Sequence, residues 1–175
     1  MKNITPSIVL AALLLFTSSG AVLHAGTELL TNGGFGDGTS GWTLVHLHDA
    51  HASVAAEPVG GGQMAAHVVV AEATAEAFYV QLFQGKLNVE AGKTYRLRFR
   101  ACSKPGAAIG VNLMLGESPW TSFSTREVTL TPEWQDFSFD LVVSQAAANA
   151  RVTFSRLGAQ PCEYWFTNVS LIMVN

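Results

Sequence analysis

The stretch TYRLRFRAC, which spans Thr94–Cys102, alternates aromatic or aliphatic side chains with arginines. Tyr95, Leu97 and Phe99 occupy every second position, and an arginine follows each of them. Successive side chains of a β-strand point to opposite faces of its sheet. We therefore expect this stretch to form a strand with one face against a hydrophobic core and the other face in water.

Runs of the same kind recur along the chain. Short segments rich in Val, Ile, Leu, Phe or Thr end at Gly, Pro, Asn or Ser, and helical periodicity is almost absent. Many short strands at near-regular spacing are typical of a β-sandwich or jelly roll. We predict an all-β fold, a β-sandwich jelly roll of two antiparallel sheets in a single domain. The expected strands are Glu28–Leu30, Trp42–His48, Gln63–Val70, Ala77–Phe83, Thr94–Cys102, Ala107–Leu115, Arg126–Leu130, Gln135–Val143, Arg151–Leu157 and Tyr164–Val174.

The beginning of the chain has the features of a secretory signal peptide. A lysine precedes the apolar run Ile8–Phe16, which is too short to span a bilayer. Small residues follow, and we expect cleavage after Ala21 or Ala25. We assign residues 1–25 to the signal peptide and residues 26–175 to the domain, and we expect a secreted, extracellular or periplasmic protein.

Composition excludes several kinds of partner. The chain has 10 Lys and Arg against 13 Asp and Glu, a net charge of −3, and no basic block or stripe. This argues against binding to nucleic acid or to an anionic membrane. About 150 residues follow the signal, the usual size of one domain, and a chain of that length buries a core without a metal or a covalent staple.

Two cysteines, Cys102 and Cys162, are present in a chain that we expect to be exported. Disulfides persist outside the cytoplasm. A bridge between these cysteines would close a loop of about sixty residues, which would stabilise the fold by roughly 4 kcal/mol on the loop-entropy model. We predict a disulfide between Cys102 and Cys162, and the alternative is a pair of buried free thiols.

A set of short motifs follows one another over nearly the whole chain after the signal. They are Asn32-Gly33-Gly34-Phe35, Ser40-Gly41-Trp42, Val80-Gln81-Leu82-Phe83-Gln84, Ala91-Gly92-Lys93-Thr94-Tyr95, Phe99-Arg100-Ala101, Thr131-Pro132-Glu133-Trp134-Gln135 and Asn168-Val169-Ser170-Leu171. Each is weak alone, but the ordered set resembles carbohydrate-binding modules of families 4 and 9. The resemblance implies a galactose-binding-domain-like jelly roll whose concave sheet face binds chains of β-linked glucan or xylan.

Such a site needs two kinds of side chain. Sugar rings stack on aromatic rings, which contributes about 1 kcal/mol by analogy with aromatic pairs, and each buried hydroxyl needs a hydrogen-bond partner. Core packing is the alternative for Phe78, whereas Trp120 follows a proline in a polar loop, where a core role is hard to explain. The resemblance implies ligand-binding roles for Trp120, Phe78, Gln81, Gln84 and Asn112.

Further polar candidates lie in the later strands. Alternation with the apolar residues of its strand points Arg151 and Ser155 towards the cleft. Relatives have one residue fewer before Leu157, so either Ser155 or Arg156 takes the polar binding role. Arg126 is an additional candidate, and a solvated surface position is its alternative. We assign the remaining tryptophans that carry motifs, Trp42 and Trp134, to structure.

A cluster of His46, His48, Asp49 and His51 admits three interpretations. His46 and His48 would share one face of a strand, and two imidazoles with a third nearby are able to hold zinc. Alternatively, His46 and His48 contact the sugar at the edge of the cleft, or the cluster is plain polar surface. No cysteine or glutamate stands at a fixed spacing from these histidines, and we expect no metal here.

Calcium is also expected to be absent. Many relatives hold a structural calcium ion with a Glu directly after the Asn-Gly-x-Phe motif and an Asp in the last strand. Those positions are Gly36 and Thr167 here, and Asp37 is displaced by one residue. Calcium prefers several oxygen ligands that usually include carboxylates, so we expect no tight calcium site and no other cofactor.

The acidic residues are scattered, and neither a nucleophile elbow nor a pair of catalytic carboxylates is recognisable. We therefore expect a non-catalytic module that binds a polysaccharide, alone or beside a separate glycoside hydrolase. The alternative is an extracellular adhesion or protein-interaction domain. Trp120 separates the two hypotheses, because a glycan site needs its ring exposed beside amides and a structural role would bury it.

Overall fold

The computed structural model describes residues 26–174, so the predicted signal peptide lies outside the described residues. Within this range the chain forms the strands β1–β10 and the short 3-10 helices η1 and η2. Neither helix of the described range is long and apolar enough to cross a membrane. The elements are β1 (Thr43–His46), β2 (His51–Gly60), β3 (Gln63–Glu72), η1 (Ala77–Tyr79), β4 (Val80–Val89), β5 (Thr94–Lys104), β6 (Ala107–Leu115), β7 (Ser122–Leu130), β8 (Gln135–Val142), β9 (Ala147–Ser155), η2 (Leu157–Ala159) and β10 (Cys162–Met173).

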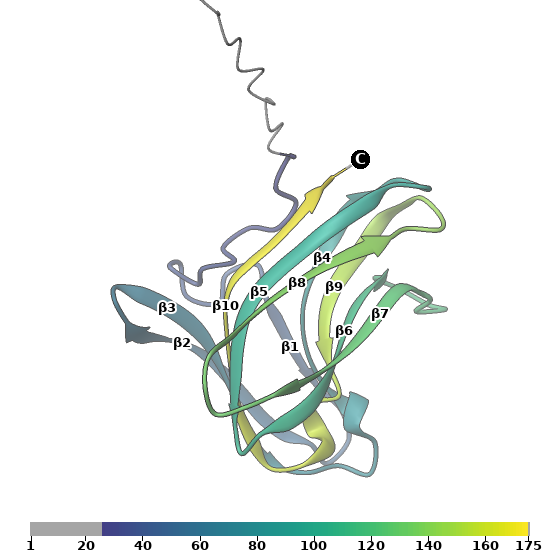
Figure 1. The fold of residues 1–175 in the computed structure, drawn as a ribbon. Coiled ribbons are helices and arrows are strands. Elements are labelled where there is room, and N and C mark those ends of the chain that lie inside the picture. Colours follow the sequence, from purple (N-terminus) through teal and green to yellow (C-terminus); the bar gives the residue numbers. More distant parts are fainter. Residues whose placement is uncertain (1–25, 175) are drawn as a thin grey trace, which may run out of the picture.

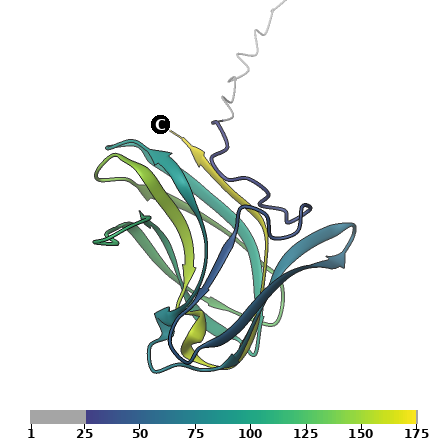
Figure 2. The same ribbon diagram turned by 180° about the vertical axis from the view of Figure 1, so that it is seen from behind.

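The strands build two antiparallel five-stranded sheets that pack face to face (Figure 1). We call the sheet with the order β1-β4-β9-β6-β7 the front sheet and the sheet with the order β2-β3-β10-β5-β8 the back sheet, although β5 and β8 lie nearer the viewer in Figure 1. The β2–β3 hairpin extends beyond the rest of the sandwich in both ribbon views (Figure 2). The prediction of an all-β jelly-roll sandwich with two antiparallel sheets is confirmed.

The hydrophobic core lies between the inner faces of the two sheets. Tyr95, Leu97 and Phe99 of β5 are buried there, as the alternation predicts. Phe154 of β9, in the front sheet, lies 5.0 Å from Phe99 and 4.3 Å from Phe166 of the back sheet, measured between ring centroids. Aromatic pairs contribute about 0.5–1.5 kcal/mol each beyond their area burial. Phe154 therefore joins the two sheets at the centre of the core.

The Asn-Gly-Gly-Phe motif attaches the N-terminal segment to the last strand. The side-chain amide of Asn32 donates to three backbone carbonyls of the turn at 37–40, at 3.0–3.3 Å. A Cβ at Gly33 would lie 1.8 Å from the carbonyl oxygen of Val169, so only glycine fits this approach. Phe35 and Trp42 are buried with ring centroids 5.3 Å apart. Trp42 is a core residue, as predicted.

Some strands differ from those predicted. β2 is absent from the predicted set, because its alanines and Pro58 lack the usual strand composition. It forms the edge of the back sheet, where a proline removes no hydrogen bond from a central ladder. β7 begins at Ser122 instead of Arg126. In the predicted strand at 28–30, Glu28 makes an isolated bridge with Ile172.

The predicted disulfide is wrong, because Cys102 and Cys162 are both buried free thiols. Cys102 of β5 lies opposite Trp165 of β10, and directly opposed residues of an antiparallel pair share one face. Cys162 precedes Trp165 by three residues on β10, so its side chain points to the other face of the sheet. The Sγ atom of Cys162 lies 3.1 Å from the carbonyl oxygen of Pro105. The back sheet itself separates the two sulfur atoms.

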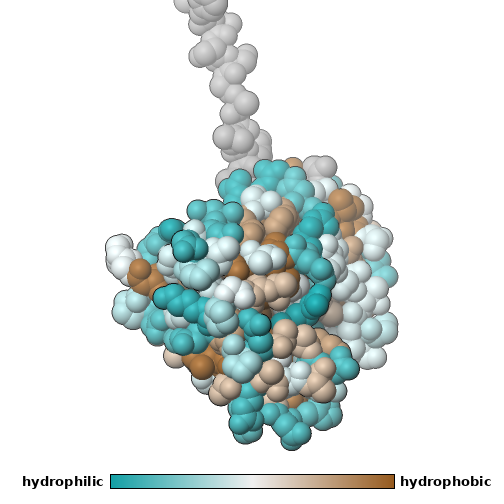
Figure 3. Space-filling model, turned by 60° about the horizontal axis from the view of Figure 1, so that its bottom comes forward, coloured by the Kyte–Doolittle hydropathy of each residue, from teal (hydrophilic) through white to brown (hydrophobic). Residues whose placement is uncertain are grey.

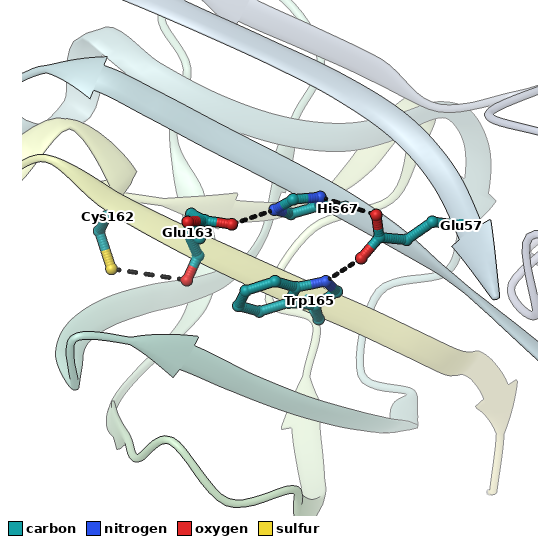
Figure 4. A network of polar contacts seen from close by, with 5 residues as sticks. All are labelled: Glu57, His67, Cys162, Glu163 and Trp165. Carbon is teal, nitrogen blue, oxygen red and sulfur yellow. Dashed lines mark hydrogen bonds and ion pairs between the residues drawn. The ribbon is translucent and has the colours of Figure 1, made fainter. Parts of the chain in front are cut away.

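Polar side chains on the outer face of the back sheet connect three strands (Figure 4). His67 of β3 lies between two carboxylates, with Nδ1 3.0 Å from Oε2 of Glu57 and Nε2 2.7 Å from Oε2 of Glu163. The Trp165 ring stacks on His67 at 4.4 Å between centroids, and its Nε1 donates to Glu57. The hydrogen bond from Trp165 and the neighbouring His67 lower the pKa of Glu57. The network fastens the β2–β3 hairpin to β10.

We expect the cysteines to be unreactive in the folded protein. Burial raises the pKa of both thiols, and the thiolate is the reactive form. Protein purified without reductant is treated with a thiol-specific chromogenic reagent. The native protein should not react with the reagent, and the denatured protein should yield coloured product equivalent to 2 thiols per chain. A disulfide-linked peptide pair in a non-reducing digest would contradict this expectation.

We expect Glu57→Gln to lower the free energy of unfolding at neutral pH. The pKa of Glu57 is lower in the folded chain than its ordinary value, so its charged form stabilises the fold above that value. The contribution is lost as the pH falls through the folded-state pKa. Because the side chain is 40% exposed, screening limits the effect to about 1 kcal/mol. Denaturant titrations at neutral pH and at about pH 3 measure it, and an equal loss at both pH values would disprove this account.

Candidate functional site

The outer face of the front sheet is hollowed by two adjoining pockets of about 610 Å³ each. They share Phe83, Gly116 and Arg151, and together they form what we call the cleft. Their volumes fall within the range of about 300–1,000 Å³ that is usual for ligand sites. The aromatic pocket is lined by Val45, Leu47, Phe78, Gln81, Phe83, Asn112, Met114, Gly116, Trp120, Ser122, Arg151 and Ser155. The polar pocket beside it is lined by Leu29, Thr31, Gly41, Trp42, Thr43, Phe83, Gln84, Gly85, Lys86, Leu87, Gly116, Asn149 and Arg151.

The register of the strands explains why these side chains meet. Leu82 of β4 is fully buried in the core, so Gln81 and Phe83 on either side of it point outward into the cleft. Phe83 pairs with Thr153 of β9, and Thr153 pairs with Asn112 of β6. Residues paired in this way share one face of the sheet, and a row of cleft side chains therefore crosses the front sheet.

Arg151 is the charged residue at the centre of the cleft. Its side chain lies between two rings, with Cζ 4.6 Å from the centroid of Phe83 and 5.0 Å from that of Trp120. Its Nη2 donates to Oε1 of Gln81 at 3.1 Å and lies 3.7 Å from the sulfur of Met114. The residue is only 9% exposed, and burial lowers the pKa of its guanidinium. Arg151 thus fixes the positions of the residues around it.

Trp120 stands over the cleft with half of its surface exposed. Its loop is closed by hydrogen bonds from the Trp120 amide to the carbonyl of Glu117 at 2.8 Å and from the Leu115 amide to the carbonyl of Thr121 at 2.9 Å. Phe78 is likewise about half exposed, at 48%, and lines the same pocket. The core-packing alternative for Phe78 is therefore wrong, and the indole of Trp120 is free to stack on a ligand.

The polar floor of the aromatic pocket is a chain of hydrogen bonds. Nδ2 of Asn112 donates to Oγ of Ser155 at 2.8 Å, and Oγ1 of Thr125 donates to Oδ1 of Asn112 at 2.9 Å. A Cβ at Gly110 would lie 2.5 Å from Oγ of Ser155, so a side chain there would displace the hydroxyl. The structure brings the predicted residues Asn112, Ser155, Gln81 and Arg151 together in this pocket, beside Trp120 and Phe78.

Three predicted residues direct their polar groups to other parts of the protein. Gln84 borders the polar pocket, but its amide is used by Thr31, which donates its N–H to Oε1 at 2.7 Å and accepts from Nε2 at 2.8 Å. Arg126 lies opposite the buried Val111, so it points away from the cleft face, and it donates to the carbonyl of Asp140 in the other sheet. Arg156 forms an exposed ion pair with Glu127 and lines neither pocket.

The histidines lie outside the cleft. His46 points to the opposite side of β1 from Val45, which lines the aromatic pocket, and its Nδ1 lies 3.0 Å from the carbonyl oxygen of Ala50. His48 follows the end of β1 at a φ of 55° and packs on Tyr79, with 4.5 Å between ring centroids. Among residues 26–174 no group of three or more His, Cys, Asp or Glu is arranged to hold a metal.

The positions expected to hold calcium in relatives do not fit the ion here. Gly36 has no side chain to offer. The hydroxyl of Thr167 is almost fully buried and donates to the carbonyl of Met64 at 2.6 Å. Calcium needs several oxygen ligands, usually with carboxylates among them, and neither position supplies a carboxylate.

Sequence reasoning missed several residues that line the cleft. Phe83 is flanked by Leu82 and Gln84, which both point to the inner side of β4, so its parity with Gln81 is the signal that identifies it. Val45 and Leu47 of the β1 region have the same kind of signal, because they alternate with His46. Lys86 carries no such signal, because it sits at a register shift in β4 with a φ of 62°.

Comparisons with known proteins also indicate a carbohydrate-binding module. A family model described as a carbohydrate-binding domain, CBM_4_9, matches residues 27–157. A solved structure described as "CBM4 structure and function" has a TM-score of 0.73 at 21% identity, covering 82% of this chain and 99% of its own. The N-terminal cellulose-binding domain of Cellulomonas fimi β-1,4-glucanase C has a TM-score of 0.58 at 17% identity, covering 77% and 90%. No curated protein sequence matches significantly.

A multidomain protein contains the same fold. The CBM22-1–GH10 modules of Clostridium thermocellum endo-1,4-β-D-xylanase 10B, solved with xylohexaose, have a TM-score of 0.58 at 12% identity. The match covers 85% of this chain and 29% of that one. Because the family model spans most of the chain, the protein belongs to the carbohydrate-binding modules of families 4 and 9. The predicted family is confirmed, and membership supports binding to a glycan.

We expect Gln84→Ala to weaken the fold and to leave the cleft intact. The change removes the partner of both backbone groups of Thr31. Because Thr31 is exposed, water replaces that partner and the loss is about 0.5–1.5 kcal/mol for each hydrogen bond. The midpoint of denaturant unfolding should fall, while retardation by a polysaccharide gel stays that of the wild type. The matched variant Gln81→Ala should show the reverse pattern. Loss of retardation in Gln84→Ala at full stability would restore Gln84 as a ligand contact.

Proposed function

We propose that this protein is a secreted, non-catalytic module that binds single chains of a β-linked polysaccharide, β-glucan or xylan, in the cleft. The observation that carries the proposal is the exposed ring of Trp120 above Arg151, with the amide of Gln81 hydrogen-bonded to the same guanidinium. The C–H faces of sugars stack on aromatic rings, while amide and guanidinium groups form hydrogen bonds with the sugar hydroxyls.

The arrangement of the cleft supports an extended ligand. The aromatic pocket is lined from every strand of the front sheet, and the polar pocket continues it past Phe83 and Arg151. A chain of sugar rings would stack on Trp120 and Phe78 in the first pocket. It would then meet mainly polar side chains and backbone in the second, including Asn149 and Lys86.

The alternative, an adhesion or protein-interaction domain, would call for a large continuous apolar surface. On the face that Figure 3 shows, hydrophobic residues lie scattered among hydrophilic ones. The aromatic side chains of the cleft instead stand beside hydrogen-bonding groups, which favours a sugar. A separate glycoside hydrolase fits as a functional partner, because a module that only binds needs a catalyst to act on the same polymer.

The proposal is tested by affinity electrophoresis through gels that contain xylan, mixed-linkage β-glucan or hydroxyethylcellulose. We expect one polymer to retard the wild type, and Trp120→Ala to weaken that interaction about fivefold to tenfold, as the loss of one stacking contact implies. Trp134→Ala is the matched control, because Trp134 directly precedes β8 and packs against Arg100 of the back sheet, and the change should leave retardation unchanged. Equal mobility of wild type and Trp120→Ala on every polymer would overturn the proposal.

A further inference from the structure

Arg151 is a buried charge without a counter-ion. Buried charged groups are nearly always paired, because their desolvation is costly. The ion pairs among residues 26–174 use Arg96 and Arg156 as their arginines and leave Arg151 out. Its nearest polar partners are neutral, the amide oxygen of Gln81 and the sulfur of Met114. The charge at the centre of the cleft is therefore uncompensated in the free protein.

The guanidinium also has donors to spare. Both of its hydrogen bonds start from Nη2, and its Nε is a buried atom with no partner. The rings of Phe83 and Trp120 attract the cation electrostatically, but a ring face carries no net charge and accepts no strong hydrogen bond. The planar fork of an arginine matches a carboxylate with two parallel hydrogen bonds.

The other charged side chain that lines the cleft is also positive. Lys86 lines the polar pocket beside Arg151, and no Asp or Glu of the described residues 26–174 lines either pocket. Glu127, on the strand at the far edge of the front sheet, is held by Arg156. This contrasts with a chain that has 13 acidic against 10 basic residues. A cleft lined by charges of one sign raises the local concentration of ligands of the opposite sign.

We infer that the polysaccharide bound in the cleft is acidic, a β-linked chain with uronic acid residues whose carboxylate pairs with Arg151. The inference rests on the proposed function, keeps the β-linked chain and adds a carboxylate to its sugar units. Lys86 in the adjoining pocket faces a further carboxylate of the same chain. A neutral glucan or xylan would occupy the same cleft and leave the Arg151 charge unpaired.

The test compares two ligands that differ only at C6, β-1,4-linked glucuronate oligosaccharides with a carboxylate and cello-oligosaccharides of equal length with a hydroxymethyl group, by calorimetric titration of the mature protein. We expect the glucuronate to bind about tenfold more tightly at low salt, and the preference to shrink as salt screens the charges. Arg151→Gln should abolish the preference. Equal or weaker binding of the glucuronate by the wild type would overturn the inference.

Two further variants keep the test decisive if Arg151→Gln fails to fold. Lys86→Asn removes an exposed charge and keeps a residue that tolerates the left-handed backbone at this position. It should lower the preference for glucuronate about twofold to fivefold. Arg98→Gln, a matched charge removal at an exposed position of the back sheet, should leave it unchanged, and equal effects of the two variants would also overturn the inference. The proposed function is tested separately, by whether a neutral polymer retards the wild type more than it retards Trp120→Ala.

Discussion

The contact of Phe154 with Phe99 and Phe166 is the joint on which the two sheets depend. Because side chains alternate along β9, burying Phe154 forces its neighbours Thr153 and Ser155 to the opposite face, and Arg151 follows them by the same rule. The register of β9 therefore determines both the core and the cleft. A shift of β9 by one residue would remove Phe154 from the core and Arg151 from the cleft at the same time.

The sandwich uses its two outer faces differently. On the back sheet, several charges have partners within the protein, as in the pair of Arg96 with Asp140 and the network around His67, although the buried Nε of Arg100 has none. On the front sheet, the cleft exposes rings and leaves its central arginine without a carboxylate. Surface ion pairs of the first kind contribute little to stability, whereas an unpaired cation is a means of selecting a ligand.

Strictly alternating segments were predictable from the sequence, and positions near irregularities were not. The strand at 107–115 has the predicted bounds, and Asn112 lies on the face that alternation gives it. Gln84 borders the polar pocket, but its amide binds the backbone of Thr31, and a motif does not state on which side of the sheet each of its residues lies. His48 lies beyond the end of β1, and the separation of Cys102 from Cys162 depends on the pairing of β5 with β10, which one-dimensional spacing does not contain.

The position of the cysteines on opposite faces of the back sheet has a consequence for how the protein is made. No covalent cross-link is needed to complete the fold, so the native state is the same in oxidising and in reducing surroundings. Each thiol is also buried in the folded chain, which keeps it from pairing with another thiol. The chain is thus free to mature without a disulfide-forming catalyst.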